Sequence, residues 1–337
     1  MKLVGKQTWV FEHGIYIQAA GTAVGPLEAE GPLRDSFDIV HDDLYCGEKT
    51  WELAERRLMR EAIQICLKKG GLSFSDIDLF LAGDLLNQNV TANYVAREIP
   101  IPFLCMFGAC STSMQTIAAA AAFIDGGFAQ SVLAATSSHN ATAERQFRYP
   151  TELGIQKPKT TTFTVTGAGA VVLGRKPGRW RITAATIGKV VDAGMTNPLD
   201  MGSAMAPAAA STIEQHFNDL DVSPSDYDLI VTGDLSRVGS VILRQLLAES
   251  GYDVTSNYND CGLMIYQPDQ KVFAGGSGCA CCAVVTYGHL LKEMQRGAFR
   301  KIFVVATGAL LSQTMVQQKQ SIPAIAHGVV IEAAKEE

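Results

Sequence analysis

The chain has 337 residues, of which 47% are hydrophobic and 18% are charged. This composition is typical of a globular protein with a large buried interior, and it excludes a disordered or fibrous chain. The 28 Lys and Arg residues against 34 Asp and Glu residues leave a net charge of -6. A chain without an overall basic field does not attract polyanions, so nucleic acid is not a predicted partner.

The first twelve residues lack the apolar segment of a signal peptide, because Lys6 and Glu12 interrupt it. We therefore expect a protein on the cytoplasmic side whose cysteines are reduced thiols rather than disulfides. Two stretches, 99–124 and 272–291, lack Asp, Glu, Lys and Arg over membrane-like lengths, but prolines or glycines interrupt both. They predict buried strands, turns and inner helices rather than transmembrane spans.

The sequence contains an internal repeat. Residues 72–85 (LSFSDIDLFLAGDL) and 222–235 (VSPSDYDLIVTGDL) are identical at eight of fourteen positions. A second pair, 128–136 and 299–307, has an offset of 171, which also aligns Ala109 and Cys110 with Ala280 and Cys281. The chain is therefore predicted to consist of two copies of one unit.

Each copy predicts the same order of elements. Thr50 is predicted to cap a helix over 51–69, which Gly70 and Gly71 end. Because helices alternate with buried strands, we expect parallel sheets. The segment 176–179 is the predicted boundary between an N-terminal half, 1–177, and a C-terminal half, 178–337. The predicted strands, in chain order, are 16–20, 79–82, 132–135, 166–173, 181–187, 229–232, 302–306 and 324–331.

Cys110 is the main candidate functional residue. Residues 108–114 (GACSTSM) predict a tight turn that brings this thiol to the start of a helix running to about Phe123. The N-terminus of a helix stabilises anions, which suits either a nucleophilic thiolate or a bound carboxylate, while a buried inert cysteine is the alternative. The alanines at 118–122 allow a helix packed on all sides, which would place Cys110 at the floor of a deep site.

Other residues offer weaker signals. None of the six histidines stands in an evident catalytic motif, although His139 directly follows a predicted strand. In the stretch 144–150 (ERQFRYP), Arg145 and Arg148 lie beside aromatic residues that include Tyr149. Guanidinium groups suit carboxylates, and a solvated charged loop is the alternative.

Metal and nucleotide motifs are absent from the sequence. The run at 279–282 (CACC) has no CxxC partner elsewhere, and 167–169 (GAG) lacks the GxxxxGK of a phosphate-binding loop. The sequence therefore predicts no metal site and no cofactor.

Two βαβαβ halves with a Gly-Ala-Cys turn at an inner helix resemble the thiolase and ketoacyl synthase superfamily. This resemblance implies an α/β, thiolase-like fold with two pseudo-repeated halves in a five-layered α-β-α-β-α arrangement, and it places Cys110 at the nucleophile position. The chain further resembles the stage V sporulation protein AD family of spore-forming bacteria. The motifs that carry this resemblance are 82–88 (AGDLLNQ), 108–114, 136–150 (TSSHNATAERQFRYP) and 164–170 (TVTGAGA).

The sequence departs from the superfamily at two positions. Where condensing enzymes have a histidine after a strand of the second half, this chain has Thr232-Gly233-Asp234, and where they have an asparagine it has Gly275-Gly276-Ser277. Losing an oxyanion donor costs about 100- to 1000-fold in rate, and losing a base costs at least as much. We therefore expect a protein that is not an enzyme.

The family resemblance implies a link to the movement of dipicolinic acid (pyridine-2,6-dicarboxylate) into the developing spore, within a membrane-associated assembly of stage V proteins. We expect this flat dicarboxylate to bind in the former acyl site. Asp234 would repel the dianion unless an Arg or a Ca²⁺ ion intervenes. The predicted ligand-binding residues are Cys110, Ser111, His139, Arg145, Arg148, Tyr149, Gly276 and Ser277.

Several alternatives stay open. The chain could be an acyltransferase that uses Cys110 as nucleophile, with His139 or His327 recruited as base, or a scaffold without a ligand. Whether Ca²⁺ accompanies dipicolinate is also open. The superfamily resemblance implies a homodimer. We expect the protein to be peripheral to the inner (forespore) membrane.

Overall fold

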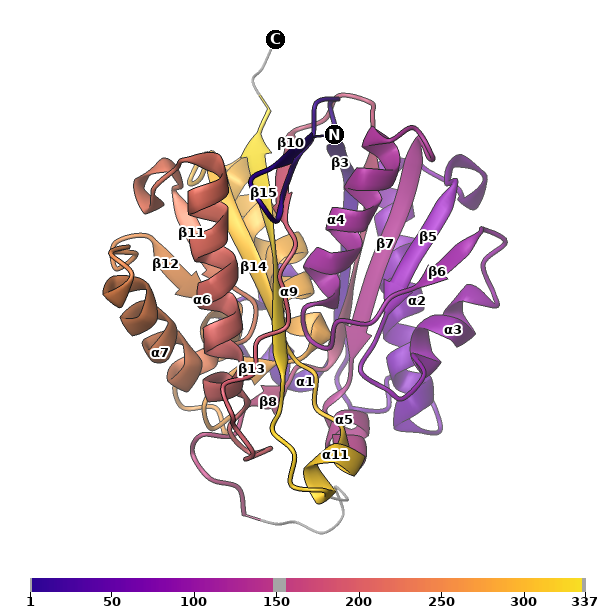
Figure 1. Ribbon diagram of the computed structural model, residues 1–337. Helices are drawn as coiled ribbons and strands as arrows, with labels where there is room; N and C mark the ends of the chain where they lie inside the picture. The colour runs from indigo at the N-terminus through magenta and orange to yellow at the C-terminus, as the bar shows by residue number, and fades with distance from the viewer. Residues whose placement is uncertain (1, 148–155, 335–337) are drawn as a thin grey trace.

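The computed structural model describes residues 2–147 and 156–334. Two halves lie side by side, each with a sheet and outer helices, and the inner helices α4 (Thr112–Asp125) and α9 (Cys279–Val284) lie between them (Figure 1). This layering of helix, sheet, helix, sheet and helix confirms the expected thiolase-like architecture.

The first half begins with β3, whose nine residues are almost all buried. Helix α2 follows, and the side chain of Thr50 accepts a hydrogen bond from the backbone N–H of Leu53 at 3.3 Å, as its cap. Gly71 ends this helix in the left-handed conformation, with φ 62°. The elements of this half are β3 (Tyr16–Val24), α2 (Trp51–Gly70), β5 (Leu79–Gly83), α3 (Val90–Ala96), β6 (Phe103–Cys105), α4, β7 (Ser131–Ser138) and β9 (Gly167–Gly174).

The second half repeats this order. Its inner helix α9 continues through a π-helical turn over Val285–Leu290 into α10 (Leu291–Gln295). The other elements are β10 (Trp180–Thr186), α6 (Met201–Leu220), β11 (Leu229–Thr232), α7 (Ser236–Glu249), β12 (Tyr258–Asp260), β14 (Lys301–Ala309) and β15 (Ala324–Ala333). All eight predicted strands are present, so the internal repeat correctly predicted a repeated structure.

The strands form one hydrogen-bonded sheet in the order β6-β5-β7-β9-β3-β10-β15-β14-β11-β12, which is symmetric about its centre. Within this order, the expectation of parallel sheets is correct for β5, β6 and β7 and for β11, β12 and β14. In each half the last strand inserts antiparallel between its neighbours, and β3 pairs with β10 antiparallel. The reason is that β9 and β15 each return without an intervening crossover helix of the βαβ type.

Helix α4 contacts strands of both halves, among them β7, β14 and β15. Its alanines at 118, 120 and 121 are almost fully buried. Small side chains on all faces let sheets approach from two sides, so the prediction of a central helix below Cys110 is confirmed.

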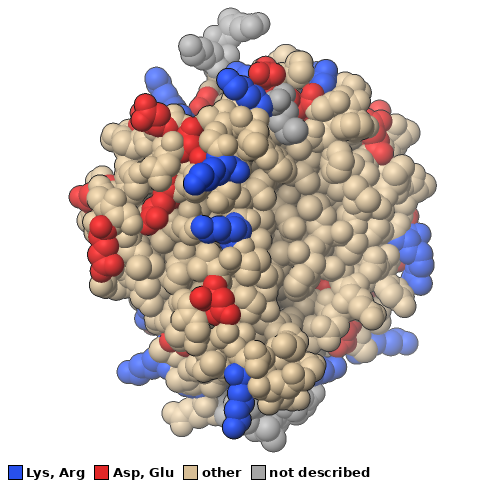
Figure 2. Space-filling model, in the orientation of Figure 1, with Lys and Arg blue, Asp and Glu red and all other residues tan. Residues whose placement is uncertain are grey.

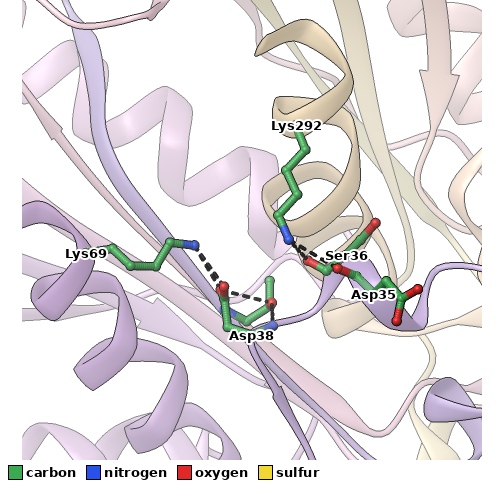
Figure 3. A network of polar contacts seen from close by, with 6 residues as sticks. Asp35, Ser36, Asp38, Lys69 and Lys292 are labelled. Atoms are coloured by element: carbon green, nitrogen blue, oxygen red, sulfur yellow. Dashed lines mark hydrogen bonds and ion pairs between the residues drawn. The ribbon is translucent and has the colours of Figure 1, made fainter. Parts of the chain in front are cut away.

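The halves are also held together at the surface. From α10, the Nζ of Lys292 donates to the carbonyl oxygen of Ser36 at 2.7 Å, and from α2, the Nζ of Lys69 lies 2.9 Å from Asp38 Oδ1 (Figure 3). Asp38 also accepts from the backbone N–H of Thr22 in β3 at 3.0 Å. These contacts join the segment after α1 (Pro26–Ala29) to α10 of the second half and to α2 of the first.

The remaining elements are short. These short elements are β1 (Lys2–Val4), β2 (Thr8–Val10), α1 (Pro26–Ala29), β4 (Ile39–Val40), α5 (Asn140–Phe147), β8 (Phe163–Thr164), α8 (Cys261–Met264), β13 (Gly276–Ser277), α11 (Gln313–Gln317) and 3-10 turns at Arg34–Ser36, Phe74–Asp76 and Pro224–Asp226.

None of the helices in the described ranges combines the length and apolar character needed to cross a membrane.

Candidate functional site

The turn before α4 holds Cys110 in a fixed position. Ala109 adopts φ 50°, a conformation that residues with a Cβ adopt at a cost. Hydroxyl groups hold the turn: Ser111 Oγ donates to the carbonyl of Gly108 at 2.6 Å, and Thr112 Oγ1 donates to the carbonyl of Ala109 at 2.7 Å. The two hydroxyls that follow Cys110 therefore stabilise the turn itself.

The second half supplies the groups that face Cys110. Asp234 lies just after β11, and Ser277 in β13 precedes α9. The carboxylate of Asp234 accepts from Ser277 Oγ at 2.7 Å, from the backbone N–H of Gly278 at 3.1 Å and from Thr307 Oγ1. Asp234 also acts electrostatically on the thiol of Cys110 and raises its pKa. The positions at which the sequence departs from the superfamily are thus brought together at this sulfur.

A second thiol links the two inner helices. Cys279 is the first residue of α9, and its Sγ donates to the carbonyl oxygen of Ala109 at 2.9 Å. Gly308 in β14 approaches the same turn so closely that a Cβ there would lie 2.3 Å from the carbonyl oxygen of Gly108. The turn is therefore enclosed by backbone and side chains from both halves.

The electrostatics disfavour a thiolate at Cys110. Burial raises the pKa of this thiol well above its ordinary value, and the nearby Asp234 carboxylate and Cys279 raise it further. A helix N-terminus alone would have the opposite effect. Burial and the Asp234 carboxylate therefore favour the protonated thiol of Cys110 over the thiolate.

Burial and hydrogen bonding act in opposite directions on the pKa of Asp234. Burial raises its pKa, while the hydrogen bonds from Thr307, Ser277 and Gly278 lower it. These three donors satisfy both carboxylate oxygens without a cation.

A pocket opens in front of Cys110 and encloses about 460 Å³, including space open to solvent. Most of its lining is apolar, and its few polar atoms come from Cys110, Thr164, Ser277 and the backbone. In the described ranges no Lys, Arg, His or Asn lines it. The lining residues are Leu85, Phe107, Ala109, Cys110, Ala143, Phe147, Thr164, Met201, Ser277, Gly278, Ala309 and Leu311.

Of the eight predicted ligand-binding residues, the structure brings Cys110 and Ser277 to the pocket lining. Ser111 is buried in the turn, and Gly276 lies just behind, where its carbonyl accepts from Ser236 Oγ at 2.7 Å. Arg148 and Tyr149 fall outside the described residues.

His139 and Arg145 do not reach the pocket. His139 is buried, its Nδ1 accepts from the backbone N–H of Ala141 at 3.2 Å, and its Nε2 lies 2.8 Å from the carbonyl oxygen of Leu44. Arg145 Nη1 lies 3.1 Å from Glu52 Oε1, and its guanidinium covers the ring of Trp51 at 4.8 Å. These contacts hold the side chain of His139 against Leu44 and that of Arg145 against α2, so neither side chain lines the Cys110 pocket.

The alternative base, His327, is also engaged elsewhere. Its Nδ1 accepts from the backbone N–H of Gly188 at 3.3 Å, and burial lowers its pKa to about 4. It lies on β15, opposite Ala306 of β14.

The sequence analysis missed most of the apolar lining. Ala143 and Phe147 are four residues apart on α5 and share its pocket-facing side, whereas Arg145 lies between them in sequence and points elsewhere. Helical spacing within 140–147 could have identified this pair. Cys279, Thr307, Met201 and Leu311 carried no signal, because only the packing of the two halves brings them to the site.

Comparisons with known structures show the fold. 3-Oxoacyl-[acyl-carrier-protein] synthase III from Aquifex aeolicus is 14% identical, with a TM-score of 0.58 over 95% of this chain and 100% of that chain. Human mitochondrial 3-ketoacyl-CoA thiolase, solved with CoA, is 14% identical, with a TM-score of 0.58 over 97% of this chain and 99% of that one. An OleA variant from Xanthomonas campestris is 15% identical, with a TM-score of 0.59 over 96% and 99%.

Sequence comparisons show the family. A family model described as stage V sporulation protein AD matches residues 5–332. Stage V sporulation protein AD of Bacillus subtilis (strain 168) is 66% identical over 334 residues, which cover 99% of each chain. The chain, with its thiolase-like fold, belongs to the stage V sporulation protein AD family.

Proposed function

We propose that the chain binds dipicolinic acid in the Cys110 pocket without catalysing acyl transfer. In this proposal it serves the uptake of dipicolinate into the developing spore, within a membrane-associated complex of stage V proteins. The observation that carries the proposal is the open apolar pocket in front of Cys110, whose thiol is held in its protonated form by burial and by the nearby Asp234 carboxylate. A protonated thiol is a poor nucleophile, while the pocket in front of it stays open.

The pocket suits a small planar ring. Phe107 and Phe147 offer aromatic surface, and the pocket walls are otherwise formed by short or aliphatic side chains. Ser277 and Thr164 place hydroxyl groups at the lining, and the 14-residue helix α4 begins directly behind Cys110. Hydroxyls and a helix N-terminus are suitable partners for a ligand carboxylate.

Calcium belongs to the cargo in this proposal. The described residues contain no group of three or more His, Cys, Asp or Glu placed to hold a metal ion. A Ca²⁺ ion that accompanies dipicolinate would therefore be held by the carboxylates of the ligand, as Ca²⁺ prefers oxygen ligands.

Calorimetric titration of the whole chain with dipicolinate tests the proposal. We expect saturable heat and a rise in melting temperature. Ala143→Phe should abolish both because it fills the pocket, whereas Val241→Phe, at a half-exposed position on α7, should bind like the wild type. A folded wild-type chain that gives neither heat nor a thermal shift would support the ligand-free scaffold instead.

The acyltransferase alternative has its own test. Incubation with acyl-CoA followed by intact-mass measurement should leave the wild-type mass unchanged. A thioester on Cys110 would overturn the non-catalytic part of the proposal. The positions of His139 and His327 give this alternative no support, because neither residue lines the pocket in front of Cys110.

We further propose that the chain forms a homodimer through the β6 edge. This strand ends the sheet, and Leu104 and Phe107 beside it are about half exposed. The surface over α4, β5 and β6 is largely free of charged side chains (Figure 2). A neutral face is self-complementary about a two-fold axis, where like charges would meet. We also propose that the chain binds other stage V membrane proteins and lies peripheral to the forespore membrane.

A further inference from the structure

Two buried carboxylates lie beneath the floor of the Cys110 pocket. Asp234 follows β11, and Asp260 ends the neighbouring strand β12, where it pairs with Thr232. Both are almost completely buried, with 1% and 0% of their surfaces exposed. The charge of Asp234 acts directly on Asp260 and raises its pKa. Because Asp260 accepts from the backbone N–H groups of Leu235 and Ser236, which directly follow Asp234, the two carboxyl groups lie close together, and we call them the Asp234–Asp260 pair.

Donors surround the pair. Asp260 accepts from Thr232 Oγ1 at 2.6 Å and from the backbone N–H groups of Leu235 and Ser236, both at 2.9 Å. Together with the donors to Asp234, these contacts allow the carboxyl groups to stay buried when ionised. Burial nevertheless raises the pKa of Asp260 to about 7. The pair can therefore change its protonation near neutral pH.

The titratable groups that face the pair are themselves acids. Cys110 from the turn before α4 faces Asp234, and Cys281 of α9 lies near both carboxyl groups. Cys261 of α8 and Tyr258 of β12 lie near Asp260, and burial raises the pKa of all these groups. The cation Arg244 of α7 acts on Tyr258. A negative charge added above this cluster would meet no compensating cation in the described pocket lining.

A dicarboxylate adds such a charge. Its ring would rest on Cys110 and Ser277, which contact Asp234 directly. Like charges at such short range inside a protein disfavour joint ionisation. Protonating one carboxylate of the pair removes a negative charge and relieves this repulsion.

We propose that binding of a dicarboxylate in the Cys110 pocket is coupled to the uptake of one proton by the Asp234–Asp260 pair. This inference rests on the proposed function. The proton comes from solvent, an O–H bond forms on one carboxylate of the pair, and no bond in the ligand breaks. The pocket then loads at lower pH and releases its ligand as the pH rises.

Calorimetry of the wild-type chain with sodium dipicolinate tests this directly. The titrations are carried out at about pH 8 in two buffers that differ in ionisation enthalpy. If binding takes a proton from the buffer, the observed heat differs between the two buffers by an amount that gives the number of protons. We expect about one proton taken up per ligand, and a Kd that rises up to tenfold per pH unit above the pKa of the pair.

Variants locate the proton. Asp260→Asn should bind dipicolinate with a Kd that depends little on pH and with a proton uptake close to zero. The matched control is Glu28→Gln, because Glu28 is equally buried and its pKa is also raised to about 7, yet it contacts Tyr266 and Thr166 rather than the pocket. This control should retain the wild-type proton count.

The outcomes separate the two claims. Saturable wild-type binding with the same heat in both buffers overturns the proton coupling and leaves the proposed function intact. Absence of binding in either buffer by a folded chain overturns both. Because the proton count is measured on the wild type, a variant that fails to fold does not decide the result.

Discussion

The buried carboxylate of Asp234 acts on the thiol of Cys110 and raises its pKa, although the two residues come from opposite halves of the chain. This relationship inverts the usual electrostatics of a thiol at a helix N-terminus. Instead of a cationic partner that favours the thiolate, an acidic partner favours the thiol. The sulfur at the start of α4 is thereby kept protonated.

The contact predicts slow alkylation of Cys110. Iodoacetamide at about pH 8 should leave Cys110 unmodified in the wild type, because burial and Asp234 hold its pKa well above the ordinary value. In Asp234→Asn the acceptor charge is lost, and each unit by which the thiol pKa falls raises the thiolate fraction about tenfold. Peptide mass spectrometry measures the rate. The wild type unfolded in urea is the control, in which Cys110 should react because neither burial nor Asp234 then raises its pKa. Rapid wild-type labelling of Cys110 would contradict this account.

The buried Glu55 predicts a loss of stability at high pH. Burial raises its pKa to about 8, with a further contribution from Asp84. Because the folded pKa lies above the unfolded value near 4.3, the folded chain retains a proton that the unfolded chain releases, and this stabilisation is lost as the pH rises towards about 8. The free energy of unfolding of Glu55→Gln should therefore rise relative to that of the wild type by on the order of 1 kcal/mol per pH unit between about pH 5 and pH 8. Urea unfolding at several pH values measures this, and a constant difference would argue against it.

The close approach at Gly308 predicts that an added methyl group disturbs the site. In Gly308→Ala the new Cβ would lie 2.3 Å from the carbonyl oxygen of Gly108, so the Cys110 turn must move. We expect a cost of about 1–3 kcal/mol in unfolding free energy and a weaker affinity for dipicolinate. Gly174→Ala, also in a strand, is the control, because its nearest neighbour at 3.3 Å is the flexible side chain of Gln18. Equal affinities of the two variants would show that the turn tolerates displacement.

The β6 edge predicts a change of oligomeric state. Leu104→Glu places a charge on the neutral face that two copies would share, so light scattering after size exclusion should show a dimer for the wild type and a monomer for the variant. Val190→Glu, at a similarly exposed apolar position, should remain dimeric. A monomeric wild type at all concentrations would rule out this interface.

The sequence predicted the repeated architecture because buried strands leave strong local signals. The motif pair at 72–85 and 222–235 located both β5 and β11, and the alanine run predicted the central position of α4. Strand direction was harder to predict, because β9 and β15 enter the sheet antiparallel to their neighbours without a βαβ crossover. The expectation of parallel sheets was therefore wrong for these two strands.

The site was less predictable than the fold. The sequence singled out Cys110 and Ser277, which line the pocket, yet it could not show that Asp234 would accept from Ser277 and raise the pKa of Cys110, since this arrangement exists only after the halves pack together. For α5, attention to charge favoured Arg145, whereas the side of the helix that meets the pocket presents Ala143 and Phe147. Local composition indicates which residues are chemically suited, and tertiary packing decides which of them point inward.

The same repeat position has acquired two tasks. Asp84 and Asp234 correspond in the duplicated motif, but Asp84 accepts from the backbone N–H groups of Leu86 and Ala92 at 2.8 Å and organises the start of α3. Asp234 instead acts on the thiol of the other copy and raises its pKa. A chain cleaved between β9 and β10 would thus place this carboxylate and the Cys110 thiol on different fragments. Ligand capture by the rejoined fragments would then report on their reassembly.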